Sequence, residues 1–106
     1  MLHADGWFIC RIGFIETVRA IGIVGGTAAT RAFSREWPAF GIVEVDQGLA
    51  EHAAALTLAR ELRSLDALHL AAALVLPRTD LTFATWDRRL HAAADAEGLR
   101  LLPGSL

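Results

Sequence analysis

The sequence predicts a single α/β domain built on a mostly parallel sheet with helices covering it. Short apolar segments that are typical of strands alternate with longer segments of helical periodicity, and no hairpin turn signal joins two strands. The chain has 106 residues, enough for one core, and it contains no repeat, linker or low-complexity stretch. We therefore expect one domain over residues 1–106.

The first half of the chain predicts two strands and two helices. Apolar and β-branched residues mark strands at 6–10 and 41–45. Between them, helical spacing runs over 11–24 and ends before a glycine pair. Thr27 can then cap a second helix that runs towards Trp37, where the following proline discourages continuation.

The second half predicts three helices and two strands. Asp46 can cap a helix over 47–62, and Ser64 can cap the next one, over 65–76, which Pro77 closes. A continuous apolar strand is expected at 81–85, because strands buried on both faces have this composition. An Ala-rich helix over 86–97 stops at Gly98 and leads to a last strand at 99–103.

Charge and cysteine content limit the possible functions. The formal net charge of −2 argues against a large general positive field for nucleic acid, although all ten basic residues are Arg, which suits phosphate contact. The lone Cys10 fits a reducing cytoplasm and is expected to be a buried small hydrophobe. We recognise no targeting segment, and no stretch approaches the roughly 18 uninterrupted apolar residues of a membrane span.

Three carboxylates lie where α/β domains place ligands, at strand ends and the helix starts that follow them. Asp66 lies in the first turn of a helix, Asp87 follows the strand at 81–85, and Glu16 lies one turn into the helix after the first strand. Each also has a purely structural interpretation. An acid in a first turn stabilises the helix N-terminus, and Glu16 can pair with Arg19 on the same helix.

The combination favours a metal site. Carboxylates held together in a low dielectric repel, and without a cation at least one of them would take up a proton. Mg²⁺ or Mn²⁺ removes that conflict, because such ions prefer oxygen ligands. They keep several waters and can activate one of them against a phosphodiester.

Two segments resemble a known family. LRSLDALHLAAAL, followed by LTFATWDRRLHAAADAEGLRLLP, resembles the C-terminal half of PIN domains, specifically the VapC-type toxins of toxin–antitoxin pairs. ICRIGFIETVRA resembles the earlier PIN segment whose Glu is the second acidic residue, and VEVDQGLAEHAAALTLAREL resembles the connecting strand and helix. The resemblance covers essentially the whole chain.

The resemblance implies a cytoplasmic endoribonuclease that depends on Mg²⁺ or Mn²⁺ and acts as the toxin of a type II toxin–antitoxin system. It also implies an RNA substrate and a cognate antitoxin. We further expect a homodimer, because exposed strand edges favour dimerisation, and no membrane. The implied catalytic and metal-binding acids are Glu16, Asp66 and Asp87. Thr85 and His69 are expected to support them. The candidates for RNA phosphate contact are Arg63, Arg88 and Arg89.

The implied fold has three layers, with helices on both faces of a mostly parallel sheet. PIN toxins begin with a strand that carries an Asp, and nothing in this sequence fills that place: Glu16 comes too early, and Asp5 precedes the wrong strand. We therefore expect the first strand and first helix of the fold to be missing, which would expose backbone on two neighbouring strands. A start codon placed too far downstream, a truncated gene or remaining strands that close the gap would each account for this.

Two alternatives remain open. A catalytically inactive, truncated PIN-like module would retain antitoxin binding or dimerisation and hydrolyse nothing. A nucleotide-binding module of the Rossmann type is suggested only by IVGGTAAT. That glycine pair follows a helix rather than a strand, which argues against a phosphate-binding loop.

Overall fold

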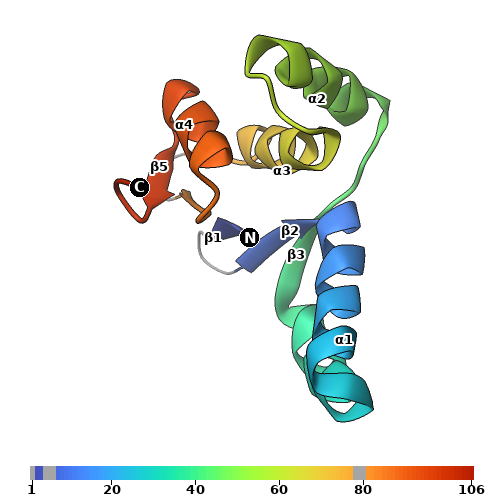
Figure 1. Cartoon of the computed structure of the whole chain (residues 1–106). Coiled ribbons are helices and arrows are strands. Elements are labelled where there is room, and N and C mark those ends of the chain that lie inside the picture. The colour runs from blue at the N-terminus through green and yellow to red at the C-terminus, as the bar shows by residue number, and fades with distance from the viewer. Residues whose placement is uncertain (1, 4–6, 78–80) are drawn as a thin grey trace.

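A five-stranded sheet forms the middle of the molecule (Figure 1). The structure, a computed structural model, describes residues 2–3, 7–77 and 81–106. Asp5 and Gly6, the latter the expected start of the first strand, lie outside the described residues. The strand order is β3-β2-β1-β4-β5. The strands are β1 (Leu2–His3), β2 (Trp7–Cys10), β3 (Phe40–Val43), β4 (Thr82–Ala84) and β5 (Arg100–Leu102).

The sheet consists of two parallel pairs joined by an antiparallel strand. β2 pairs with β3 in parallel, and β4 pairs with β5 in parallel, as the alternating sequence pattern predicted. The two-residue β1 lies between these pairs and is antiparallel to both β2 and β4. The sequence analysis did not predict β1 or any antiparallel pairing. Two residues are too short to show the alternation by which strands are recognised.

Helices follow each parallel strand except β5. The helical segments are α1 (Arg11–Glu36), the 3₁₀ turn η1 (Trp37–Ala39), α2 (Gln47–Ala59), α3 (Ser64–Leu74) and α4 (Arg88–Ala96). In Figure 1, α2, α3 and α4 gather on one side of the sheet, while α1 extends away from them. At Gly26, α1 has a φ of 67° and a ψ of −160°, which is a kink inside the run. The expected break at the glycine pair is therefore confirmed, because only glycine adopts such a backbone readily.

Helix ends differ from expectation at two places. Asp46 caps α2 as predicted, its carboxylate accepting a hydrogen bond from the backbone N–H of Leu49 at 2.8 Å. The helix stops before Arg60, however, because the next residue, Glu61, has a left-handed φ of 54°. The prediction that Ser64 caps α3 is wrong: Arg63 is the N-cap residue, and its side chain makes no capping hydrogen bond.

The core centres on α3. Ala67, Leu70 and the three alanines that follow Leu70 have no exposed surface. Small side chains let α2 and the sheet approach α3 closely, and Phe83 of β4, 2% exposed, fills the space beside them. The first turns of α3 and α4 are thereby held at fixed positions at one edge of the core.

The first helix packs less tightly. Four aromatic rings connect its two halves to the start of β3: Phe14, Phe33, Trp37 and Phe40. By length and composition, α1 could cross a membrane. Its most apolar 18-residue stretch has a mean hydropathy of 1.3, and 6% of that stretch is buried in the structure. This is weak evidence of a span, because core helices and signal sequences pass the same test.

Candidate active site

Asp66 and Asp87 lie at the starts of two helices that the core holds side by side. Asp66 is in the first turn of α3, and Asp87 is the N-cap of α4. One carboxylate oxygen of Asp87 accepts a hydrogen bond from the backbone N–H of Leu90 at 2.9 Å. The backbone N–H of Asp87 in turn donates to the hydroxyl of Thr85 at 3.1 Å. These two hydrogen bonds fix the backbone at Asp87 and one of its carboxylate oxygens.

The guanidinium group of Arg63 lies close to both carboxylates. Its Nε lies 3.2 Å from Oδ2 of Asp66, and its Nη2 lies 3.9 Å from Oδ2 of Asp87. The Arg63 side chain is 79% exposed, whereas that of Asp66 is 17% exposed. The two acids and two arginines, Arg63 and Arg89, line a hollow of about 350 Å³. We call this space the acidic hollow.

Glu16 lies outside the acidic hollow. It is exposed on α1, the helix that follows β2. Within the described parts of the chain, no three His, Cys, Asp or Glu side chains are grouped closely enough to hold a metal ion. The structure thus brings together two of the three expected acids, and the third remains on a neighbouring helix.

The imidazole of His69 experiences the charges of both Asp66 and Glu16. Burial lowers the pKa of the His69 imidazole, while the negative charges of Asp66 and Glu16 act in the opposite direction. The Nδ1 atom of His69 lies 3.7 Å from Sγ of Cys10. The side chain of His69, which belongs to α3, therefore faces the start of α1, and burial favours its neutral form.

Cys10 and Gly13 lie against the imidazole ring of His69. Cys10 is 1% exposed, as its sequence interpretation predicted, but it is also the N-cap of α1. Its sulfur accepts the backbone N–H of Gly13 at 3.4 Å. A Cβ atom added at Gly13 would lie 2.6 Å from Cε1 of His69. Sequence reasoning missed this contact, since only the folded chain brings residues 10–13 against residue 69.

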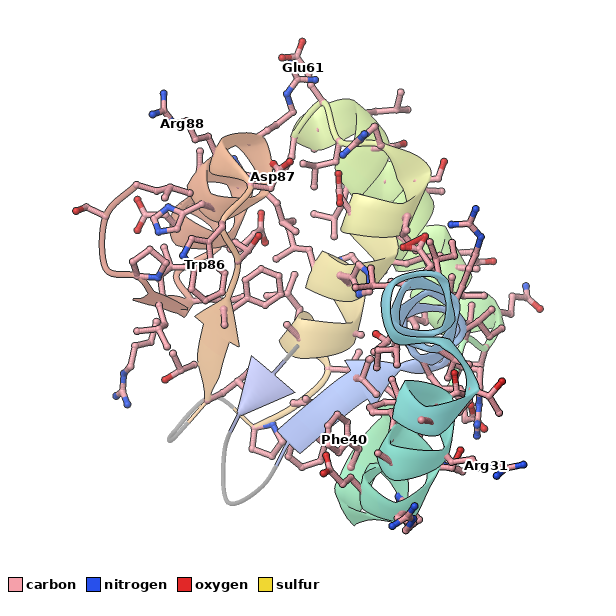
Figure 2. The ribbon with its side chains drawn as sticks, turned by 60° about the horizontal axis from the view of Figure 1, so that its bottom comes forward. Arg31, Phe40, Glu61, Trp86, Asp87 and Arg88 are labelled. Carbon is pink, nitrogen blue, oxygen red and sulfur yellow. The ribbon has the colours of Figure 1, made fainter. Side chains whose placement is uncertain are left out.

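Of the three arginines expected at an RNA surface, Arg63 and Arg89 line the acidic hollow, and Arg88 lies exposed at the start of α4. Arg63 is held by the two carboxylates, and Arg89 reaches the backbone carbonyl of Glu61 at 3.5 Å. Arg88 is exposed, and Figure 2 shows its side chain pointing outward beyond Asp87. Positive charge therefore borders the hollow although the whole chain is slightly acidic.

The donor set of the hollow fits a hydrated divalent cation. Mg²⁺ is commonly bound through one or two carboxylates while it keeps several waters. Asp66 and Asp87 supply oxygens of that type, and Arg63 already occupies the space between them with positive charge. A cation at this position would replace Arg63 as the charge that offsets the two acids.

The fold and the acidic hollow define an α/β protein with paired carboxylates at adjacent helix starts. The chain belongs to the PIN domain family, because a model of that family matches residues 1–96. It is similar to ribonuclease VapC45 and ribonuclease VapC49 from two strains of Mycobacterium tuberculosis. Each is 42% identical over 78 residues, which cover 74% of this chain and 54% of the relative. The chain thus matches about half the length of these curated relatives, and no solved structure matches it.

Proposed function

We propose that the chain is the ribonuclease toxin of a type II toxin–antitoxin system, hydrolysing RNA phosphodiester bonds with Mg²⁺ or Mn²⁺. The observation that carries the proposal is the acidic hollow. Asp66 and Asp87, recruited from two helices of a PIN-family chain, face one space bordered by arginines. The relatives named as ribonucleases support the same reaction class.

In this proposal, the acids bind the cation and the arginines bind the substrate. Asp66 and Asp87 would hold the cation, and Glu16 would contribute from α1 as a third acid. The bound cation supplies a water of lowered pKa and neutralises charge on the phosphate. Thr85 fixes the backbone of Asp87. Arg88 and Arg89 would contact phosphates, with Arg63 joining them once it leaves the carboxylates.

The proposed partners follow from the same class. RNA is the substrate, a small cognate antitoxin covers the site, and the chain works in the cytoplasm without a membrane. A homodimer is supported by three exposed apolar residues on α1: Ile15, Ile23 and Val24. The three-layer arrangement is part of this proposal, and β1 joins the two parallel pairs into one sheet.

One observation favours a second candidate, an inactive PIN-like module that keeps antitoxin binding or dimerisation. Among the described residues, Glu16 does not join the two aspartates in a group that could hold a metal. A two-carboxylate site binds a divalent cation more weakly than one with three acids, because fewer charges offset the dehydration of the ion.

Cleavage of RNA by the purified chain tests the proposal against this alternative. We expect Mn²⁺-dependent cleavage that Asp66→Asn reduces by at least about a hundredfold, the scale on which catalytic electrostatic groups act. Asp95→Asn, an exposed carboxylate elsewhere on α4, is the matched control and should cleave like the unaltered chain. Equal cleavage by the unaltered chain and Asp66→Asn would exclude the carboxylate mechanism. No cleavage by either would favour the inactive module.

A further inference from the structure

Arg63 is held loosely, in contrast to another arginine three residues earlier. The guanidinium of Arg60 donates to Oε2 of Glu97 at 2.6 and 2.9 Å, and these two side chains are only 33% and 23% exposed. Arg63 is 79% exposed, lies 3.2 Å from Asp66 and 3.9 Å from Asp87, and makes no capping hydrogen bond to α3. Because water screens exposed ion pairs, the Arg63 side chain can leave the carboxylates with little loss of stability.

Arg63 faces the carboxylate oxygen of Asp87 that a cation would need. The other oxygen, Oδ1, accepts the backbone N–H of Leu90, which leaves Oδ2 for further ligands. The Nη2 atom of Arg63 is directed to this Oδ2, and its Nε is directed to Oδ2 of Asp66. A divalent cation shared by the two acids would therefore meet the guanidinium group at the same oxygens. Since like charges at such distances repel, the bound cation and the Arg63 ion pairs disfavour one another.

A phosphate group in the acidic hollow would give the released guanidinium a new partner. Guanidinium groups bind phosphate oxygens through two parallel hydrogen bonds. The second arginine of the hollow, Arg89, already reaches the backbone carbonyl of Glu61, whereas Arg63 has no such backbone contact in the described residues. The two ligands therefore assist one another. The cation releases Arg63 for the phosphate, and the phosphate draws Arg63 away from the oxygens that the cation binds.

We propose that Arg63 is a shared countercharge that moves from the two carboxylates to a phosphate of the RNA and thereby makes cation binding and RNA binding cooperative. This inference rests on the proposed ribonuclease function and adds a form of regulation to it. Without RNA, Arg63 stays on Asp66 and Asp87 and weakens the binding of a cation. By linkage, RNA strengthens cation binding by the same factor as the cation strengthens RNA binding.

Mn²⁺ binding with and without an oligonucleotide tests the inference apart from catalysis. Free Mn²⁺ is followed by electron paramagnetic resonance while the chain is titrated, alone or saturated with a short 2′-O-methyl oligonucleotide that is checked to be intact afterwards. Binding of Mn²⁺ to the oligonucleotide alone is subtracted. We expect the oligonucleotide to lower the Kd of Mn²⁺ for the unaltered chain by about tenfold, a typical coupling between two sites.

Arg63→Gln should remove most of this coupling. Its Kd for Mn²⁺ without the oligonucleotide should already be about tenfold lower, and the oligonucleotide should lower it further by less than about threefold. Arg100→Gln, which removes the same charge, is the matched control and should behave like the unaltered chain. Arg100 is exposed at the start of β5, which lies beside the start of β4, whereas Asp87 follows the end of β4.

The outcomes separate this inference from the proposed function. Equal coupling in Arg63→Gln and the unaltered chain, or no effect of the oligonucleotide on Mn²⁺ binding by the unaltered chain, would overturn the role of Arg63 even if the chain cleaves RNA. The same holds if Arg63→Gln and the unaltered chain bind Mn²⁺ equally well without the oligonucleotide. Coupling that depends on Arg63 in a chain that never cleaves RNA would instead overturn the ribonuclease and support the movement of Arg63 between the two ligands.

Discussion

His69, on α3, is buried against the start of α1, and the charges of Glu16 and Asp66 both act on its imidazole. Its imidazole has a pKa lowered by burial, and the two carboxylates oppose that effect. Its Nδ1 atom also faces the thiol of Cys10. The folded chain therefore holds His69 neutral at a pH where an unfolded chain would already have begun to protonate it.

This difference predicts a loss of stability at mildly acidic pH. Above about pH 6.5, both the folded and unfolded chains carry a neutral His69, and its contribution does not change. As the pH falls below that value, the unfolded chain takes up a proton that the folded chain does not. The free energy of unfolding then decreases, by at most about 1.4 kcal/mol per pH unit, until the folded-state pKa is passed.

Urea unfolding in EDTA between pH 7.5 and 5.5 measures this effect. We expect His69→Gln to flatten the pH dependence relative to the unaltered chain, whatever its effect on stability at pH 7.5. The exposed pair of Arg11 and Glu44 does not interfere, because the pKa of Glu44 is lowered from 4.5 and its stabilisation is lost only below that pH. Parallel pH curves for the two chains would contradict the assignment to His69.

At the residue scale, the sequence singled out Asp66 and Asp87 as candidates but did not predict their connections. Asp66 and Asp87 could be selected because both open helices after a loop or strand, a local property. Their shared contact with Arg63 depends on how α3 and α4 pack, so it could not be read from either segment alone. The sequence analysis also included Trp86 in a helix, whereas α4 begins at Arg88.

At the scale of elements, the approach of α1 to α3 depends on Gly13. A Cβ at this position would lie 2.6 Å from Cε1 of His69 and 3.0 Å from Cγ1 of Ile9. Gly13→Ala should therefore push α1 away from α3 and reduce the free energy of unfolding by about 1–3 kcal/mol, the usual cost of overpacking. Urea unfolding followed by circular dichroism gives the value.

Gly22→Ala on the same helix is the matched control. Its added Cβ would meet only Oγ1 of Thr30, at 3.4 Å, which a small movement relieves. Alanine also favours a helix over glycine by about 1 kcal/mol, so this variant should be neutral or more stable. A Gly13→Ala chain as stable as Gly22→Ala would mean that α1 and α3 are not in close contact.

Most elements were predictable because their signals are local. The capping Asp46, the glycine pair in α1 and the apolar strand β4 each mark an element within a few residues. The wrong assignment at Ser64 has a physical reason: a serine can cap a helix or be its first residue, and the loop before α3 decides between the two. The end of α2 depended on Glu61 adopting a left-handed backbone, which glutamate rarely does.

At the scale of the whole molecule, cation binding at the acidic hollow should stabilise the fold. A ligand that binds only the folded chain adds about 2.7 kcal/mol when its free concentration is a hundredfold above Kd. For a domain of this size that corresponds to a rise in Tm of roughly 10 °C or more. We expect Mn²⁺ to raise the Tm of the unaltered chain and of Asp95→Asn, measured by calorimetry, and not that of Asp87→Asn.

Arg63 provides an internal check on this prediction. Because Arg63 and the cation compete for the same two carboxylates, Arg63→Gln should reach the same rise in Tm at a lower Mn²⁺ concentration. A rise of equal size in Asp87→Asn would show that Mn²⁺ binds elsewhere on the chain.

The central strand could not be predicted, and it has a consequence for the chemistry. In the described residues only β1, with Leu2 and His3, separates β2 from β4 within the sheet. Glu16 is carried by the helix that leaves β2, and Asp87 follows β4. A change in the twist of the sheet at β1 would therefore alter the distance between Glu16 and Asp87. The proposed contribution of Glu16 to the site would then depend on the centre of the sheet as well as on the connections that follow β2 and β4.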